Sequence, residues 1–249
     1  MKLAVMGDIH SNYAALRATL TAIEADAVDV ILCLGDLVGY NAEPKECLAL
    51  IRARVPWVVR GNHDEDVCGD DVLLGTGRAA RVVQRWTRQL LDASELAQLE
   101  NLPNYILQRD KFIAVHGCFL NDKHTYGYVT ESMLGENLER IAARTDWPKL
   151  AFCAHTHVPL LGWLDGDHVV RADLESRVVY PPQARATLLN PGSVGQPRDG
   201  DTRASYALVD IAARSVQIRR VSYDIEQTIR KNQQVGLAAE FSERLREGR

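Results

Sequence analysis

The 249-residue sequence has few of the features that mark membrane, disulfide-bonded or polynucleotide-binding proteins. No stretch approaches the roughly 20 consecutive apolar residues of a membrane span, and the first apolar run is too short for the core of a signal peptide. The cysteines are odd in number and lack CxxC spacing, so neither a disulfide framework nor a structural zinc site is indicated. We therefore expect a cytoplasmic protein that does not enter a membrane.

The sequence also has no excess of positive charge. Lys and Arg number 29 against 33 Asp and Glu, which gives a formal net charge of -4. Proteins that grip long nucleic acids neutralise phosphates with a field of cations, so a nucleic acid polymer is not expected as a partner. Apolar residues make up 46% of the chain, as in an ordinary globular protein, and this share predicts a sizeable core.

Short apolar runs alternate with segments of helical period up to about residue 154, which is typical of strands and helices that succeed each other in an α/β protein. Strands are expected at 3–6, 28–34, 55–59, 112–115 and 150–154. Helices are expected after a cap at Ser11 or Asn12, at 45–54, at 77–91, from Ser94, and between Thr130 and Arg144.

Beyond residue 154 the pattern changes to strands joined by tight turns. Asp165-Gly166 is a hairpin signal between strands expected at 160–164 and 169–174. Further strands are expected at 186–189, 204–211 and 216–221, and together they predict an antiparallel second half. The charged tail at 224–249 has the pattern of one or two surface helices. We expect one domain over 1–249, with 224–249 as a C-terminal helical extension.

Five expected strands end in the same way, because each apolar run breaks into a small residue and then a potential metal ligand. Side chains at the carboxyl ends of strands converge in α/β proteins even when they lie far apart in the sequence. The five segments are Met6-Gly7-Asp8-Ile9-His10, Leu34-Gly35-Asp36, Arg60-Gly61-Asn62-His63-Asp64, Val115-His116-Gly117 and Cys153-Ala154-His155-Thr156-His157.

The distribution of histidine supports a metal site at these strand ends. Five of the 7 histidines lie in these segments, although a single such histidine is more often a packed core or surface residue. Carboxylate, imidazole and amide ligands together suit manganese, iron, cobalt or zinc better than calcium, which prefers oxygen ligands throughout.

The five segments, in this order, resemble the calcineurin-like metallophosphoesterases, whose pattern is DxH, GD, GNHD, a strand-end His and GHxH. The resemblance spans about residues 1–210. It implies an α/β (α+β) fold, a four-layer α/β/β/α sandwich of two mixed sheets flanked by helices. It also implies two divalent metal ions, with manganese expected and iron, cobalt, nickel or zinc as alternatives.

The resemblance further implies a role for each site residue. One metal would be held by Asp8, His10, Asp36 and His157, and the other by Asp36, Asn62, His116 and His155. Asp36 would bridge the two ions, and a metal-bound hydroxide would attack phosphorus in line. His63 would not bind metal but would act as the general acid.

Two motifs resemble the small bacterial phosphodiesterases in particular, namely 35–40 (GDLVGY) and 190–199 (NPGSVGQPRD). The second motif predicts that Arg198 contacts a phosphate, although a surface arginine beside a structural turn is the alternative. Asn12 and Tyr128 are further expected substrate contacts. Ala154 replaces the usual glycine, and the loop after His116 departs from the family pattern, so the preferred phosphoester is not determined by these motifs.

The expected function is therefore a metal-dependent phosphoesterase, with a phosphodiesterase favoured, that hydrolyses a small phosphorylated substrate. A dinucleoside polyphosphate hydrolase and a phosphomonoesterase are alternatives within the same chemistry. A non-catalytic binding module on the same fold is an alternative of another class. The sequence does not determine the oligomeric state, although the extra C-terminal strands and helices could support a homo-oligomer such as a dimer.

Overall fold

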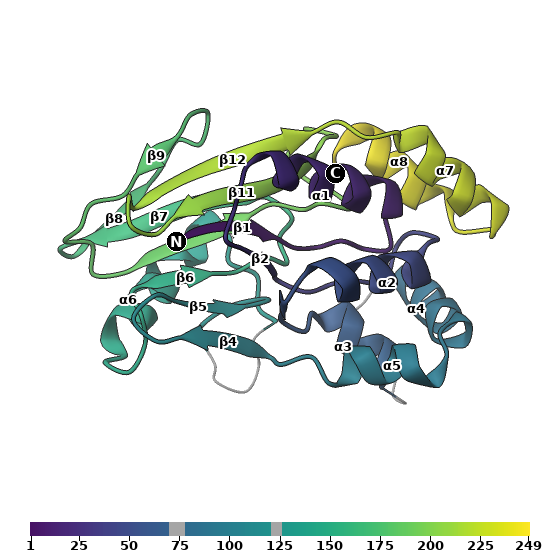
Figure 1. The fold of residues 1–249 in the computed structure, drawn as a ribbon, viewed down its shortest axis with the longest axis horizontal. Coiled ribbons are helices and arrows are strands. Elements are labelled where there is room, and N and C mark those ends of the chain that lie inside the picture. Colours follow the sequence, from purple (N-terminus) through teal and green to yellow (C-terminus); the bar gives the residue numbers. More distant parts are fainter. Residues whose placement is uncertain (70–77, 121–125) are drawn as a thin grey trace.

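Two six-stranded sheets form the centre of the computed structural model, which describes residues 1–69, 78–120 and 126–249 (Figure 1). In the first sheet the strand order is β3 (Trp57–Val58), β2 (Val30–Cys33), β1 (Lys2–Met6), β11 (Ala204–Asp210), β12 (Ser215–Val221) and β9 (Val178–Val179). In the second sheet it is β4 (Tyr105–Gln108), β5 (Phe112–Val115), β6 (Leu150–Phe152), β10 (Thr187–Pro191), β7 (Pro159–Asp165) and β8 (His168–Arg171).

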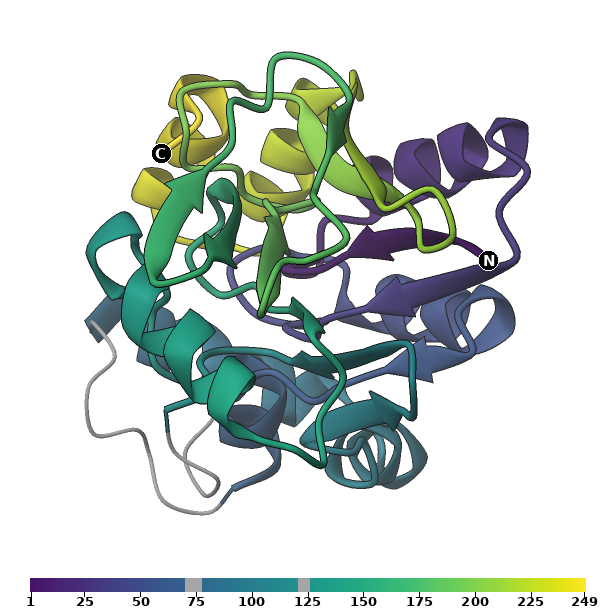
Figure 2. The same cartoon turned by 90° about the vertical axis from the view of Figure 1, so that its left-hand side faces the viewer.

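Helices lie outside both sheets, so the layers follow the order α/β/β/α. Figure 2 shows α1 outside one sheet and α6 outside the other. The helices are α1 (Tyr13–Ala25), α2 (Pro44–Arg54), α3 (Asn62–Cys68), α4 (Arg78–Leu90), α5 (Ala93–Glu100), α6 (Leu134–Ala143), α7 (Ile225–Gln234) and α8 (Ala239–Glu247), with a short 3-10 turn at Glu131–Met133. The four-layer sandwich implied by the family resemblance is confirmed.

The alternation of side chains along β1 explains why two cores are needed. Leu3 and Val5 face the second sheet, whereas Ala4 and Met6 face α1 and α2, and all four side chains are fully buried. A strand buried on both faces reads as a continuous apolar run, as this one does. A third apolar cluster lies between the second sheet and α6.

Most expected elements are present, and the antiparallel second half is confirmed, because the described strands beyond residue 154 pair with one another only in antiparallel fashion. β10 also pairs in parallel with β6, a strand of the first half, which was not expected. One expectation was wrong in detail. Ser94 does not cap α5, because Asp92 accepts hydrogen bonds from the N–H groups of Ser94 and Glu95. The short strands β4 and β9 were not expected.

Two other expectations are tested only in part by the described residues. Residue 77, the expected start of a helix, lies outside the described residues, and α4 begins at Arg78. The tail forms the two helices α7 and α8, while its separation as an extension of a single domain stays a prediction. Within the three described ranges, no helix is both long and apolar enough to cross a membrane.

Phe152 tests the core between the two sheets. Its ring is fully buried and lies 5.1 Å from the ring of Phe112, between centroids. Replacement by alanine removes this packing and leaves a cavity, so Phe152→Ala is expected to lower the free energy of unfolding by about 3–5 kcal/mol. Tyr105→Ala on β4, where the side chain is exposed, is the control and should change it by less than about 1 kcal/mol. If urea titrations give the two variants the same loss in free energy of unfolding, the packing of Phe152 between the two sheets is contradicted.

Candidate metal centre

The seven expected metal ligands all lie just beyond strands that run in parallel. β1, β2 and β3 are parallel neighbours in the first sheet, and β5 and β6 are parallel neighbours in the second. Their carboxyl ends therefore meet at one end of the sandwich, where ligand sites gather in α/β folds. In Figure 1 this is the end at which α2, α3 and α4 lie.

An unusual backbone conformation aims these ligands. Positive φ angles are uncommon in residues other than glycine, and they persist only where the surrounding structure imposes them. Five of the expected ligands have positive φ, namely Asp8 (51°), His10 (48°), Asp36 (53°), His155 (70°) and His157 (63°). The concentration of strained backbone at the expected ligands indicates a functional site.

The first ligand group has two imidazole nitrogens that face each other. His10 Nε2 and His157 Nε2 lie 3.0 Å apart. The Nδ1 atoms lie 3.1 Å from the carbonyl oxygen of Val38 and 2.6 Å from that of Gln196, respectively. Because a carbonyl oxygen only accepts, each Nδ1 carries the hydrogen in the neutral ring and each Nε2 presents a lone pair. Two lone pairs at this distance fit a cation between them.

The second ligand group shows the same arrangement around His116. Its Nδ1 donates to the carbonyl oxygen of Leu34 at 2.7 Å, which leaves Nε2 as a lone pair in the neutral ring. This Nε2 lies 3.1 Å from both Asn62 Oδ1 and His155 Nδ1. Three electron-rich atoms therefore converge, and they fit a divalent cation of the kind that takes mixed nitrogen and oxygen ligands.

Asp36 lies between the two groups. Its Oδ1 accepts the backbone N–H of His63 at 2.8 Å, and its Oδ2 has no hydrogen-bond partner within the described ranges. Oδ2 lies 3.5 Å from His10 Nε2 in the first group and 3.4 Å from His116 Nε2 in the second. One carboxylate oxygen thus reaches both groups, as a bridging ligand must.

Asp8 is held in the same manner. Its Oδ2 accepts the backbone N–H of His155 at 3.1 Å, while its Oδ1 is buried without a partner among the described residues and lies 3.7 Å from His157 Nε2. A buried carboxylate oxygen that is left unpaired is costly. The two orphaned oxygens, of Asp8 and Asp36, are therefore the observation that best fits metal ions at this cluster.

The charges of these groups are strongly coupled. Burial raises the pKa of Asp8 to about 7. Burial also opposes the charge of Asp36, but the neighbouring His116 and His63 outweigh it and hold the pKa well below its usual range. Burial likewise opposes the charge of His116, yet the carboxylate of Asp36 raises its pKa to about 9. The cluster thus attracts positive charge, either as a proton or as a metal ion.

The N-terminus of α3 fixes Asp36 in place. The first N–H groups of a helix lack partners within the helix, and Asp36 Oδ1 accepts one of them, the N–H of His63. A side chain at Gly61 would collide with Asp36 Oδ1, so glycine is required for this approach. Asp64 completes the junction, because its carboxylate accepts the N–H groups of Gly61 and Leu37 at 2.9 and 2.8 Å.

His63, the expected general acid, is buried beside the cluster. Its ring lies 4.8 Å from that of His10 and 4.6 Å from that of Tyr40, between centroids. The amide of Gln84 on α4 donates to His63 Nδ1 at 3.2 Å and to Asp66 Oδ2 at 3.0 Å. An acceptor role for Nδ1 places the hydrogen on Nε2 in the neutral ring.

Two of the three expected substrate contacts lie at the cluster. The Tyr128 ring stacks on that of His155 at 4.2 Å and is half exposed. Arg198 donates to Gln196 Oε1 at 2.9 Å and reaches the Tyr40 hydroxyl at 3.4 Å. Both side chains therefore lie beside residues of the candidate cluster, and their contact with substrate stays a prediction.

Asn12 has another role. Its side chain is fully buried and caps α1, with Oδ1 accepting the N–H of Ala15 and the hydroxyl of Thr228. Its Nδ2 donates to the carbonyl oxygen of Gly195 and to the hydroxyl of Tyr223. These bonds occupy the amide in the ligand-free fold, so the structure gives Asn12 a capping role, and its expected contact with substrate stays a prediction.

Sequence reasoning assigned no role to Tyr40, Gln84 or Asp64, although the first and last lie inside quoted motifs. Tyr40 has its ring 4.4 Å from that of His10. Gln84 lies on a helix far from the motifs, and its only signal was a polar residue on the buried side of α4.

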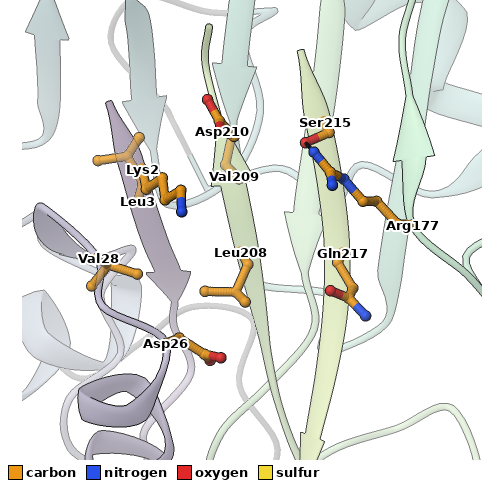
Figure 3. Close-up of a pocket in the computed structure, with 10 residues that line it drawn as sticks. All are labelled: Lys2, Leu3, Asp26, Val28, Arg177, Leu208, Val209, Asp210, Ser215 and Gln217. Atoms are coloured by element: carbon orange, nitrogen blue, oxygen red, sulfur yellow. Dashed lines mark hydrogen bonds between the residues drawn. The ribbon is translucent and has the colours of Figure 1, made fainter. Parts of the chain in front are cut away.

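A small pocket at another part of the molecule is not part of the centre. It has a volume of about 150 Å³ and is lined by residues of β1, β11 and β12 and by Asp26 after α1 (Figure 3). Lys2 marks the amino end of β1, whereas the candidate ligands follow its carboxyl end. No candidate ligand lines this pocket.

Comparisons with known proteins agree with this geometry. Residues 1–214 match the family model of the calcineurin-like phosphoesterase superfamily domain. An uncharacterized protein of Methanocaldococcus jannaschii is 35% identical over 247 residues, which cover 99% of this chain and 98% of that protein.

Two solved structures have the same fold. A metallophosphoesterase from Sphaerobacter thermophilus is 35% identical, with a TM-score of 0.85 over 100% of this chain and 99% of that one. A hypothetical protein from Pyrococcus horikoshii OT3 is 19% identical, with a TM-score of 0.80 over 100% of this chain and 98% of that one, and it shows the fold alone. The chain, with its candidate metal-binding cluster, therefore belongs to the calcineurin-like phosphoesterase superfamily, a superfamily of hydrolases.

Proposed function

We propose that this protein is a phosphodiesterase that uses two divalent metal ions to hydrolyse a small phosphate ester. The observation that carries the proposal is the pair of unpaired, buried carboxylate oxygens, on Asp8 and Asp36, among imidazole lone pairs. A folded chain would not tolerate such a cluster without a cation or protons to compensate it.

Each ion has its own set of protein ligands in this proposal. Asp8, His10, Asp36 and His157 would hold one ion, and Asp36, Asn62, His116 and His155 would hold the other. Two such ions supply Lewis acidity toward phosphoryl oxygens and a water with a lowered pKa. The mixture of nitrogen and oxygen donors suits manganese, with iron, cobalt, nickel or zinc as alternatives.

The chain's own groups do the remaining work. Gln84 orients the His63 ring through its contact at Nδ1, and the imidazolium form of His63 donates its Nε2 proton to the oxygen of the leaving group, which leaves the ring neutral. Burial lowers the pKa of His63, although the carboxylate of Asp36 opposes this shift. Arg198 binds a phosphate oxygen with its guanidinium group, and the Tyr128 ring covers His155 from the solvent side.

A diester is favoured over a monoester because space adjoins the cluster. A pocket of about 920 Å³ is lined by Tyr40 and Arg198 and continues away from the ligands. A diester needs room for two organic groups, whereas a monoester needs room for one. A dinucleoside polyphosphate also satisfies this requirement and is the second candidate. A non-catalytic module needs neither the unpaired carboxylate oxygens nor a buried His63.

Metal stoichiometry tests the ligand sets. Purified protein loaded with manganese and then desalted is expected to hold two ions per chain by elemental analysis. Asp36→Asn removes the shared ligand and should lower occupancy at both positions, whereas Asn62→Ala should lower it at one. Glu43→Gln, at a buried carboxyl outside the cluster, is the control and should keep two ions. Two manganese ions per chain in Asp36→Asn would contradict the role of Asp36 as a ligand shared by both ions.

Substrate class is tested by a side-by-side activity screen. Bis(p-nitrophenyl) phosphate, p-nitrophenyl phosphate and diadenosine tetraphosphate are offered to the manganese-loaded protein, with Asp36→Asn as the inactive control. The diester is expected to give the highest kcat/KM, because the pocket accepts its second organic group. A preference for the monoester would overturn the diester proposal, and absence of turnover with all three would favour the non-catalytic module.

His63 and Gln84 are tested together. Removing a general acid costs about 10²–10⁴-fold in rate, so His63→Asn should lower kcat by this amount while metal content stays at the wild-type value. Gln84→Met keeps the shape but loses the donor, and it is expected to lower kcat about tenfold or more with little change in KM. Gln89→Met, at an exposed position of α4, is the matched control. Wild-type kcat and an unchanged pH profile in Gln84→Met would show that the contact is only structural.

A further inference from the structure

The pocket of about 920 Å³ lies between α4 on one side and α8, with the residues just before it, on the other. α4 contributes Arg78, Val82 and Val83, and the connection from α7 into α8 contributes the opposite wall from Gly236 to Arg244. Figure 1 shows α4, α7 and α8 at the same end of the molecule as the candidate metal centre. A concave space of this volume is in the range that holds a small-molecule ligand.

Tyr40 joins this pocket to the metal centre. On one side its ring lies 4.4 Å from His10 and 4.6 Å from His63, and on the other side 5.5 Å from Phe241 on α8, between centroids. Arg198 lies beside it, with its guanidinium carbon 5.7 Å from the Tyr40 ring centroid. A substrate whose phosphorus lies at the metal centre can therefore extend past Tyr40 into the pocket.

The pocket is rich in cations. Arg78, Arg198 and Arg244 line it against one acidic residue, Glu240, and within the described ranges none of the three arginines forms an ion pair with a carboxylate. One arginine of α8 outside the pocket behaves differently. Arg246 on α8 pairs with Glu226, at 2.9 Å.

An arginine that is not paired with a protein carboxylate and faces a pocket is suited to bind phosphate, because its planar fork makes two parallel hydrogen bonds. Arg198 is accounted for by the phosphate at the metal centre in the proposed function. Arg78 and Arg244, which lie on opposite walls, have no such role in the proposed function. They indicate a second anionic group on the ligand of this pocket.

The rest of the lining is apolar and aromatic. Phe241 and Tyr40 present rings, and Val82 is 60% exposed, which is high for a valine beside a pocket. Leu237 and Ala238 lie on the opposite wall. Such a surface suits a flat, weakly polar group such as a nucleobase or an aryl ring.

We propose that the pocket is a specificity site for a phosphodiester that carries a second phosphate group on a nucleoside-like body. This inference rests on the proposed function and deepens it, because it names the substrate class. Arg78 and Arg244 bind the second phosphate, and Tyr40 and Phe241 contact the nucleobase or other flat group of that body. Helix α8 and the residues just before it complete the site, and they lie beyond residues 1–214, the part that matches the family model.

Two chromogenic substrates that differ by one phosphate test this proposal. Thymidine 5′-(p-nitrophenyl phosphate) has only the scissile diester, whereas its 3′-phosphorylated analogue also carries the second phosphate, and both release p-nitrophenol. The manganese-loaded wild-type protein is expected to show a kcat/KM about tenfold or more higher for the analogue, as one charge-assisted phosphate contact would give.

Arginine variants connect this preference to the pocket. The ratio of the two kcat/KM values is expected to fall several-fold in Arg78→Ala and in Arg244→Ala, and to approach one in the double variant. Arg85→Ala on α4 and Arg246→Ala on α8 do not line the pocket and should keep the wild-type ratio. A ratio of one in the wild type, or a ratio that the double variant leaves unchanged, overturns the inference.

A binding measurement separates this inference from the proposed function. Calorimetric titration compares thymidine 3′,5′-bisphosphate with thymidine 5′-monophosphate, and the wild type is expected to bind the bisphosphate about tenfold or more tightly. If the wild type binds the bisphosphate more tightly but hydrolyses neither ester, the second phosphate site is supported and the proposed phosphodiesterase function is refuted. If it hydrolyses both esters but binds the two nucleotides with equal dissociation constants, the phosphodiesterase function is supported and the second phosphate site is refuted.

Discussion

The carboxylate of Asp36 is the constraint on which the rest of the centre depends. One of its oxygens is taken by the backbone N–H of His63, so the side chain cannot rotate away, and the other is directed at histidines from both ligand groups. Transfer of a negative charge from water into the protein interior is costly unless cations compensate it. The same contact orients the start of α3, and with it Asn62 and His63, so a single hydrogen bond couples the proposed bridge to the proposed acid.

The fold supplies what this carboxylate needs by bringing parallel strand ends together. Five candidate ligands adopt left-handed backbone, which the tightly packed turns impose and a free loop would relax. Gly61 allows Asp36 to approach the helix, and Asp64 ties the loop after β2 to α3. Rigid elements rather than mobile loops therefore set the positions of the ligands, as precise metal sites require.

The candidate ligand cluster was predictable from sequence because its signals are local, whereas the layers were implied by the resemblance to a family. Each strand-end block combines a small residue with a ligand, and parallel strands must bring such ends together. The buried capping role of Asn12 was not distinguished from a substrate contact, because a polar residue beside the blocks has the same sequence pattern in either role. Gln84 and Phe241 were not foreseen, since their partners lie 21 and 201 residues away in the chain and only tertiary packing joins them. The parallel pairing of β10 with β6 was missed for the same reason.

The central claim is that two metal ions lie on either side of Asp36. It is tested most directly by anomalous diffraction at the manganese edge from crystals of the manganese-loaded protein. The account predicts two peaks flanking Asp36 Oδ2, one beside His10 and His157 and the other beside His116 and His155. A single peak, or peaks that do not touch Asp36 in a protein that hydrolyses diesters at its full rate, would contradict it.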